Sequence, residues 1–237
     1  MKDVSIIFEN DDILLINKES GVSVQGGVGI AHPLDEELPK QLGYKIHLVH
    51  RLDKETAGIL IVAKNPAAAA KWTRLIQTDQ VQKVYTAVCF GRPQLNGKAS
   101  LEGRLAGTVE AHGRTQDAEL FFKVTDSWKE KVVSVNGDTG ETSEKEIELC
   151  KVLITLGTGR MHQIRIQMAK AGAPLAGDDK HGNFKLNKLA RKVGIKKLQL
   201  AATRLTIPVN GKATTFEIPL PEHFKSNAQT VFVNQGL

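Results

Sequence analysis

The sequence contains few cysteines and no long hydrophobic run. Its two cysteines among 237 residues, Cys89 and Cys150, lie in strand-like segments and show neither a Cys-x-x-Cys nor a Cys/His spacing. This pattern argues against a disulfide framework or a zinc site and indicates two buried thiols in a reducing cytoplasm. No run of 18 apolar residues is present, so a membrane partner is not expected. Residues 1–5 also lack the ordered regions of a signal peptide.

Phosphate-binding glycine motifs and internal repeats are also missing. Residues 21–29 hold four glycines, but no G-x-G-x-x-G or G-K-[ST] pattern follows a strand and opens a helix there. No period of about 20 to 50 residues recurs, which argues against a repeat architecture. These absences leave an ordinary globular domain as the expectation.

The length and composition predict one large domain. Hydrophobic residues make up 41% of the chain and charged residues 24%, which is typical of globular proteins. Strand-like runs outnumber helical ones, so we expect an α+β fold with a mainly antiparallel sheet. Apolar runs at 4–8 and 13–17 predict a hairpin, and Asn65 before Pro66 predicts the start of a helix over 67–77. Residues 31–48 and 95–116 are expected to be irregular.

Positive charge is concentrated in one part of the chain. The formal net charge is +6, but residues 160–204 alone hold eleven Lys and Arg against Asp178 and Asp179, a local charge of +9. Residues 184–197 read as a helix without any acid. Such a surface is typical of nucleic-acid binding, although a Lys-rich helix can also be an ordinary solvated face.

Residues 126–148 have the opposite charge balance. They contain seven acids against three lysines and include Asn136-Gly137, a strong signal for a two-residue hairpin turn. We interpret this segment as an acidic hairpin that decorates the domain and repels a polyanion from its side.

Residues 48–65 combine a polar cluster with a buried strand. His50, Arg51, Asp53 and neighbouring polar residues precede the wholly apolar run at 59–63. A carboxylate in a loop ahead of a buried strand is a plausible catalytic group, but the same pattern fits an ordinary connection.

Two further segments carry candidate functional groups. Residues 81–92 alternate as a strand does, with Tyr85 two positions after Lys83. Residues 157–172 predict a helix that ends before Gly172, with Arg165 beside an apolar stripe. An arginine beside an apolar stripe must either reach solvent or find a carboxylate partner, and Asp53 is a candidate partner.

These segments resemble the motifs of the RluA-type pseudouridine synthases. The run HRLDKETAGILIVAK at 50–64 is similar to that family's HRLDxxTSGLLLxAK motif, KVYTAVCFG at 83–91 to its KxYxAxVxG strand, and GRMHQIRIQM at 159–168 to its GRxHQIRxH segment. Residues 13–22 and 198–208 resemble the opening and closing motifs. The likeness runs in the family's order from about residue 6 to residue 224.

The chain departs from the family pattern at several positions. They are Ala57 for the usual Ser, Gln167 for a His, Gln25 followed by two glycines for HPG, His181 for a Tyr, and Ala201 for a His. None of them removes an expected catalytic group. They concern substrate contacts more than the chemistry.

The resemblance implies an enzyme that isomerises a specific uridine of tRNA or rRNA to pseudouridine, in a single catalytic domain spanning 1–237 with a central cleft. Asp53 would be the nucleophile, Tyr85 would stack on the uracil or act as a base, and Arg165 would hold Asp53 by a bidentate pair. Arg51 would enter the base stack as the uridine flips out, and Leu200 would line the base pocket. The other expected RNA contacts are His50, Lys83, Arg160, His162, Lys185, Lys188, Lys192, Lys196 and Lys197.

The resemblance also implies no metal, no organic cofactor and a monomer. Because the likeness begins near residue 6, we expect no separate N-terminal RNA-binding module. Two alternative functions stay open. The first is a metal-dependent phosphoesterase or nuclease using His47, His50 and Asp53, which the adjacent Arg51 disfavours. The second is a non-catalytic RNA-binding module.

Overall fold

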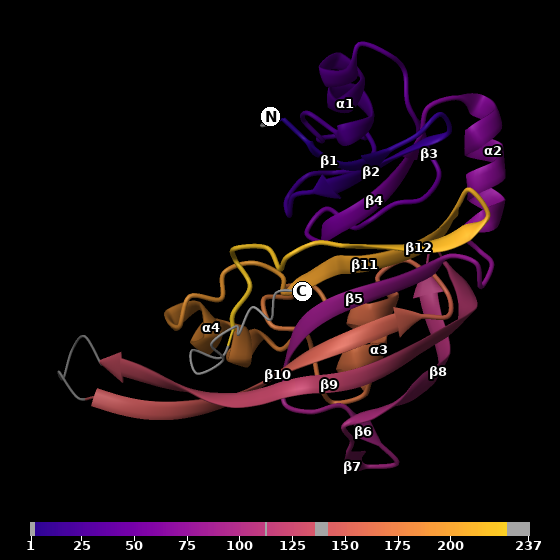
Figure 1. The fold of residues 1–237 in the computed structure, drawn as a ribbon. Helices are drawn as coiled ribbons and strands as arrows, with labels where there is room; N and C mark the ends of the chain where they lie inside the picture. The colour runs from indigo at the N-terminus through magenta and orange to yellow at the C-terminus, as the bar shows by residue number, and fades with distance from the viewer. Residues whose placement is uncertain (1–2, 112, 136–141, 227–237) are drawn as a thin grey trace, which may run out of the picture.

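The large sheet places strands from the two ends of the chain side by side. The computed structural model describes residues 3–111, 113–135 and 142–226. The strand order is β1-β2-β4-β11-β5-β10-β9-β8, with β3 beside β4 and β12 beside β11 (Figure 1). These strands are β1 (Ser5–Glu9), β2 (Ile13–Lys18), β3 (His47–Leu48), β4 (Ala57–Ala63), β5 (Gln82–Phe90), β8 (Glu102–Ala111), β9 (Arg114–Val135), β10 (Thr142–Leu156), β11 (Leu200–Val209) and β12 (Lys212–Glu217). Neighbouring strands of this sheet pair antiparallel, except β4 and β11, which pair in parallel. This confirms the expected mixed, mainly antiparallel sheet.

Four helices and a small second sheet complete the described part of the chain. The helices are α1 (Leu34–Leu42), α2 (Pro66–Leu75), α3 (Gln163–Lys170) and α4 (Phe184–Lys192), and the small sheet pairs β6 (Gln94–Leu95) with β7 (Lys98–Ala99). The Asn65 side chain accepts the Ala68 N–H and Pro66 occupies the first position of α2, as the sequence predicted. No helix in the described residues is long and apolar enough to cross a membrane.

Alternate residues of β5 face different hydrophobic clusters. Tyr85, Ala87 and Cys89 belong to the main cluster, which also contains buried residues of α1 and α3. Val88 and Phe90 belong to a cluster that includes Ala190 of α4 and residues of β9 and β10. A further cluster joins α2 to β2, β4 and β11. From Val84 to Phe90 β5 is buried on both faces, so packing fixes the side chains of this part of the strand.

The parallel pairing of β4 with β11 joins the two halves of the sheet. Gly58 pairs with Ala202 and has a φ of +116°. A Cβ at this position would overlap the Ala202 carbonyl oxygen and lie 2.6 Å from its backbone nitrogen. Only glycine allows this close approach, which brings the segment preceding β4 next to β5 and β11.

Two segments that were expected to be irregular have regular structure. Residues 34–42 form α1 although Pro39 lies inside it, because Leu34 and Leu38 are buried one turn apart and Gly43 ends the helix in a left-handed conformation. Residues 102–111 form β8, which pairs with β9 along its whole length. In both cases packing or strand pairing outweighs weak local signals.

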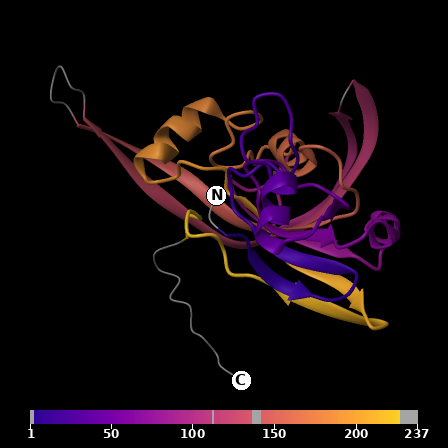
Figure 2. The same ribbon diagram turned by 90° about the horizontal axis from the view of Figure 1, so that it is seen from above.

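The acidic hairpin contributes to the core at its base. Strands β9 and β10 project as a long two-stranded arm beside α4 (Figures 1 and 2). Trp128, Val132, Ile147 and Leu149 are buried against Ala190 of α4, a role that the acidic composition did not predict. The expected turn at Asn136-Gly137 lies outside the described residues.

Candidate active site

Asp53 lies in a turn directly before β4. The Thr56 N–H donates to the Asp53 carbonyl at 3.1 Å, which closes the turn. Lys18, buried at the end of β2, donates its ammonium group to three backbone carbonyls, including that of Lys54 at 3.2 Å. Burial lowers the pKa of Lys18 to about 8, although the charges of Glu55 and Asp53 oppose this shift. Lys18 therefore fastens the Asp53 turn to β2.

Tyr85 and Leu200 come from the two strands beside this turn. Tyr85 of β5 lies opposite Ala202 in β11, and Leu200 opposite Ala87. Tyr85 is 8% exposed. Burial raises the pKa of its phenol well above the usual value, and the Asp53 charge adds to the shift. The phenol is therefore protonated at neutral pH and lies against the pocket that contains Asp53.

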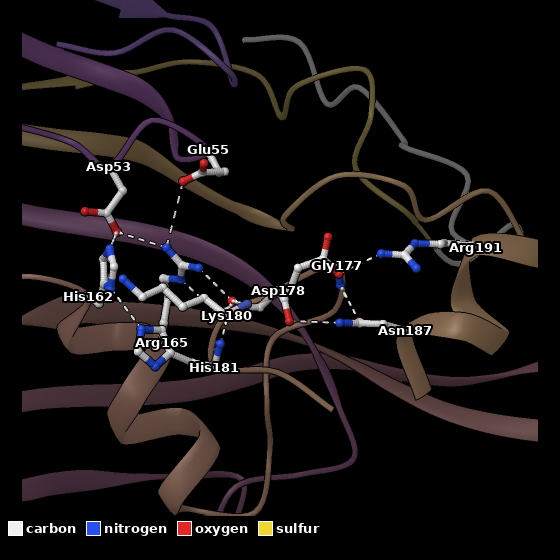
Figure 3. A network of polar contacts seen from close by, with 11 residues as sticks. Asp53, Glu55, His162, Arg165, Gly177, Asp178, Lys180, His181, Asn187 and Arg191 are labelled. Atoms are coloured by element: carbon white, nitrogen blue, oxygen red, sulfur yellow. Dashed lines mark hydrogen bonds and ion pairs between the residues drawn. The ribbon is translucent and has the colours of Figure 1, made fainter. Parts of the chain in front are cut away.

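Arg165 of α3 faces Asp53 but forms its two-pronged pair with another residue. Its Nη1 lies 3.6 Å from Asp53 Oδ2 and 3.9 Å from Glu55 Oε2. Its Nε and Nη2 donate to the two carboxylate oxygens of Asp178 at 2.8 and 2.7 Å. The predicted contact between Arg165 and Asp53 is present, but the predicted bidentate geometry is wrong. Asp178 is the bidentate partner (Figure 3).

The Arg165–Asp178 pair is buried, and its surroundings favour the charged form of both side chains. Arg165 is 4% and Asp178 1% exposed. Burial opposes the charge on Asp178, but Arg165 and the backbone N–H groups of His181 and Lys180 outweigh it and lower the pKa of the carboxyl. Burial likewise opposes the charge on Arg165, but the carboxylates around it raise its pKa. The pair is therefore a fixed positive and negative charge beside the pocket.

A pocket of about 70 Å³ brings together half of the predicted site residues. Its lining includes the predicted catalytic groups and the predicted flipping and base-pocket residues, namely Arg51, Asp53, Tyr85, Arg160, His162, Arg165 and Leu200. A groove of about 650 Å³ adjoins it and shares Arg51, Tyr85 and Arg160 with it. The pocket and the groove together form the central cleft that the resemblance implied.

The groove has a positively charged wall. Arg51 and Arg160 are exposed there, and Lys83 is half-buried, with its Nζ donating to the Ile76 carbonyl at 3.1 Å. Burial lowers the pKa of Lys83. Three basic side chains and Asp79 line the same groove, so its charge suits a phosphate backbone.

Two histidines meet beside Asp53. His162 Nδ1 and His181 Nε2 are 2.8 Å apart, and His162 Nε2 lies 3.8 Å from Asp53 Oδ2. Burial lowers the pKa of both imidazoles, and the nearby Arg165 and Lys180 charges act in the same direction. The two rings are therefore neutral at pH 7. His162 adopts a left-handed conformation with a φ of 53° immediately before α3.

His50 has a structural hydrogen bond that its predicted role did not include. The Ile61 N–H donates to its Nε2 at 2.9 Å. Burial lowers the pKa of His50 to about 3, and the Lys83 charge adds to this shift. A nitrogen that accepts this bond is not free to ligate a metal. In the part of the chain that the structure describes, no group of three His, Cys, Asp or Glu residues could hold a metal ion, so the phosphoesterase alternative has no support there.

The five predicted RNA-binding lysines lie apart from the pocket. Lys185, Lys188 and Lys192 belong to α4, and Lys196 and Lys197 follow it. All five are exposed, and none lines the pocket or the adjoining groove. The turn at 177–182 connects Arg165 to α4, because Asp178 pairs with Arg165 and Asn187 bonds to Gly177 and Asp178.

Sequence reasoning missed Asp178 and Thr56. Asp178 was counted only as one of two acids in a basic segment, and its GDDKHG surroundings indicate no more than a turn. Thr56 lines the pocket, and its Oγ1 is buried with no hydrogen-bond partner among the described residues. A buried Arg165 requires a carboxylate partner, and this requirement could have pointed to Asp178. The sequence reasoning assigned the role to Asp53.

The fold is that of a pseudouridine synthase domain. The solved structure of Human RNA Pseudouridylate Synthase Domain Containing 1 is similar to it with a TM-score of 0.67 and 22% identity, over 92% of this chain and 84% of that one. Human RNA Pseudouridylate Synthase Domain Containing 4 gives a TM-score of 0.67 and 22% identity over 93% and 90%. At this identity the likeness establishes the fold.

Sequence comparison leads from the fold to the family. Residues 12–170 match the RNA pseudouridylate synthase family. The ribosomal large subunit pseudouridine synthase C of Rickettsia felis is 33% identical over 92% of this chain and 68% of its own length, and that of Haemophilus influenzae 32% identical over 94% and 67%. The chain belongs to the RNA pseudouridylate synthase family and is an enzyme that isomerises uridine in RNA, as the resemblance implied.

Proposed function

We propose that this enzyme converts a uridine of large-subunit ribosomal RNA to pseudouridine, with Asp53 as the nucleophile. The substrate follows from the names of relatives that are 31–33% identical and act on the large ribosomal subunit. The observation that supports the chemistry is the meeting of Asp53, Tyr85 and Arg165 in one pocket, since these residues come from distant parts of the chain.

The reaction breaks the bond between ribose C1′ and uracil N1 and forms one between C1′ and C5. The C5 proton leaves, and N1 gains a proton, so that the product is an isomer of uridine. In this proposal the Asp53 carboxylate stabilises or attacks the electron-poor centre while the base turns. Arg165 orients Asp53 through Nη1.

Tyr85 is suited to act after Asp53 has reacted. Its phenol is protonated in the free enzyme because burial and the Asp53 charge raise its pKa. When Asp53 forms a covalent bond its negative charge is lost, which lowers the pKa of the phenol and makes it easier to ionise to the phenolate, the form that can accept a proton. Before that step Tyr85 supplies a flat surface against which the base can stack.

RNA binding would extend from the cleft to α4. Arg51 and Arg160 lie where the pocket meets the groove and are placed to replace or hold the flipped nucleotide. Leu200 supplies an apolar wall of the pocket. His162 and Lys83 are further RNA contacts in the cleft, and the five exposed lysines at 185–197 would contact phosphates.

We also propose that the enzyme acts as a monomer in the cytoplasm. Cys89 and Cys150 lie opposite each other in β5 and β10, and both are free and buried. Two adjacent reduced thiols are typical of a reducing compartment.

The test of the proposed function is pseudouridine formation in a defined RNA. Purified protein is incubated separately with large-subunit ribosomal RNA transcripts and with tRNA transcripts, and pseudouridine is mapped by chemical labelling and primer extension. We expect one modified position with the wild type and none with Asp53→Asn, while Asp12→Asn, a surface carboxylate paired with Lys71, keeps full activity. Modification only of tRNA would refute the proposed substrate, and equal activity of Asp53→Asn would refute the proposed nucleophile.

A further inference from the structure

The turn at 177–182 makes contacts that the reaction itself does not require. Asp178 uses both carboxylate oxygens on Arg165, and its Oδ1 also accepts the Lys180 and His181 N–H groups at 2.9 Å each. With four donors around a carboxylate that is 1% exposed, Asp178 is not accessible to a substrate. Its contribution to the site is therefore made through Arg165.

Asp178 determines which edge of the guanidinium faces the nucleophile. Arg165 has three nitrogens, and Asp178 occupies Nε and Nη2, so only Nη1 points toward Asp53 and Glu55 (Figure 3). The Nη1 distances of 3.6 and 3.9 Å are longer than charge-assisted hydrogen bonds. The Asp53 carboxylate thus feels a nearby positive charge without being held by a two-pronged pair.

Helix α4 holds the turn in place. Asn187, 2% exposed, donates from Nδ2 to the Asp178 carbonyl at 2.8 Å and accepts the Gly177 N–H at 2.9 Å. Arg191 of the same helix also pairs with Asp179 at 2.7 Å, but both side chains are exposed, so this pair adds little to the hold on the turn. A Cβ at Gly177 would overlap the Lys197 carbonyl, so the turn is also packed tightly against the segment after α4.

We propose that Asp178 is a positioning residue of the active site, which keeps Arg165 from forming a two-pronged pair with Asp53 and is itself held by Asn187 of α4. Without the Asp178 carboxylate, Nε and Nη2 of Arg165 lose their acceptor, and the guanidinium turns toward Asp53. Asp53 is the remaining carboxylate that lies nearest to Nη1. A nucleophile held by two short charge-assisted bonds is less free to attack. Helix α4 therefore helps to fix the orientation of Arg165 through the turn at 177–182.

The experiment compares Asp178→Asn with Asp179→Asn, a matched loss of one negative charge at the next residue. This inference rests on the proposed function, so pseudouridine formation by the wild type is measured first. Single-turnover rates under enzyme excess and RNA dissociation constants are then determined for each variant. We expect Asp178→Asn to slow the reaction about 10- to 100-fold, with RNA affinity unchanged, and Asp179→Asn to stay within about twofold of the wild type because exposed pairs contribute little.

A double-mutant cycle separates positioning from general damage. If Asp178 acts through Arg165, adding Asp178→Asn to Arg165→Lys lowers the rate by less than about twofold more, since interacting residues are not additive. Independent, multiplicative losses would overturn the proposal, as would an unchanged rate in Asp178→Asn or a loss confined to RNA affinity.

A second variant covers the case in which Asp178→Asn does not fold. Asn187→Ala leaves both charges in place and removes the two bonds to the turn. We expect it to slow the reaction by about 10-fold and to be non-additive with Arg165→Lys. A full rate in Asn187→Ala would refute the connection to α4. An inactive wild type would instead refute the proposed function.

Discussion

His50 provides the sharpest test of the structure because its hydrogen bond makes stability depend on pH. Its Nε2 accepts the Ile61 N–H at 2.9 Å, which only the unprotonated nitrogen can do. Burial, together with the Lys83 charge, lowers its pKa from 6.5 to about 3. Protonation is therefore disfavoured in the folded protein and remains free to occur in the unfolded chain.

The sign and size of the effect follow from linkage. Between pH 6.5 and about 3 the unfolded chain binds a proton at His50 that the folded protein does not, so the free energy of unfolding falls as the pH is lowered. Each pH unit in this range costs about 1.4 kcal/mol. On going from pH 7 to pH 5, His50 alone is expected to remove about 2 kcal/mol of stability.

The assay is urea unfolding of the wild type and His50→Gln at pH 7 and pH 5. The glutamine carbonyl can accept the Ile61 N–H but does not titrate, so the variant should lose about 2 kcal/mol less than the wild type over this interval. Contributions from the other histidines are common to both proteins and cancel. An identical pH dependence of the two proteins would refute the buried, neutral His50.

Three other changes test the close contact of β4 with β11, the pocket and the basic surface. Gly58→Ala should destabilise the protein by about 3 kcal/mol or more in a urea titration, because the new Cβ meets the Ala202 backbone. The control is Gly21→Ala: Gly21 has a φ of +95° but open space around it, so this change should cost only about 1–2 kcal/mol. Equal losses in the two variants would contradict the packing argument. Thr56→Val should raise the free energy of unfolding by about 1 kcal/mol, because it removes a buried hydroxyl without a partner in the described residues. A lower stability of the variant in thermal or urea unfolding would show that the hydroxyl is hydrogen-bonded. Alanine at the five lysines of 185–197 should reduce the slope of log RNA affinity against log salt by up to about 3, and an unchanged slope would exclude this surface from RNA binding.

The sequence predicted the elements of the fold well where local signals were strong. The hairpin of β1 and β2, the capped start of α2 at Asn65 and the strand that carries Tyr85 all form as expected. Helix α1 was missed because Pro39 is a poor local signal, yet the burial of Leu34 and Leu38 stabilises it. Strand β8 was missed because its stability comes from β9, a partner that no local pattern reveals.

The candidate site was predicted in its members but not in its geometry. Motif resemblance named Asp53, Tyr85 and Arg165, and the structure brings all three to one pocket. It also suggested that Arg165 pairs bidentately with Asp53, whereas the two-pronged partner is Asp178. The choice between two carboxylates depends on the direction in which the guanidinium points, and that direction is set by packing between α3 and the turn at 177–182.

The amino-acid sequence alone predicted the class of the chain, its strand-rich fold, its uneven charge and the members of the candidate site, because these depend on residue types and short-range order. Tertiary structure decided how those residues meet. Gly58 lets β4 approach β11 so that Asp53 lies beside Tyr85, and Asp178 turns one edge of Arg165 toward Asp53. Such relations arise from close packing between segments that are far apart in the chain, and no periodicity or motif encodes their distances.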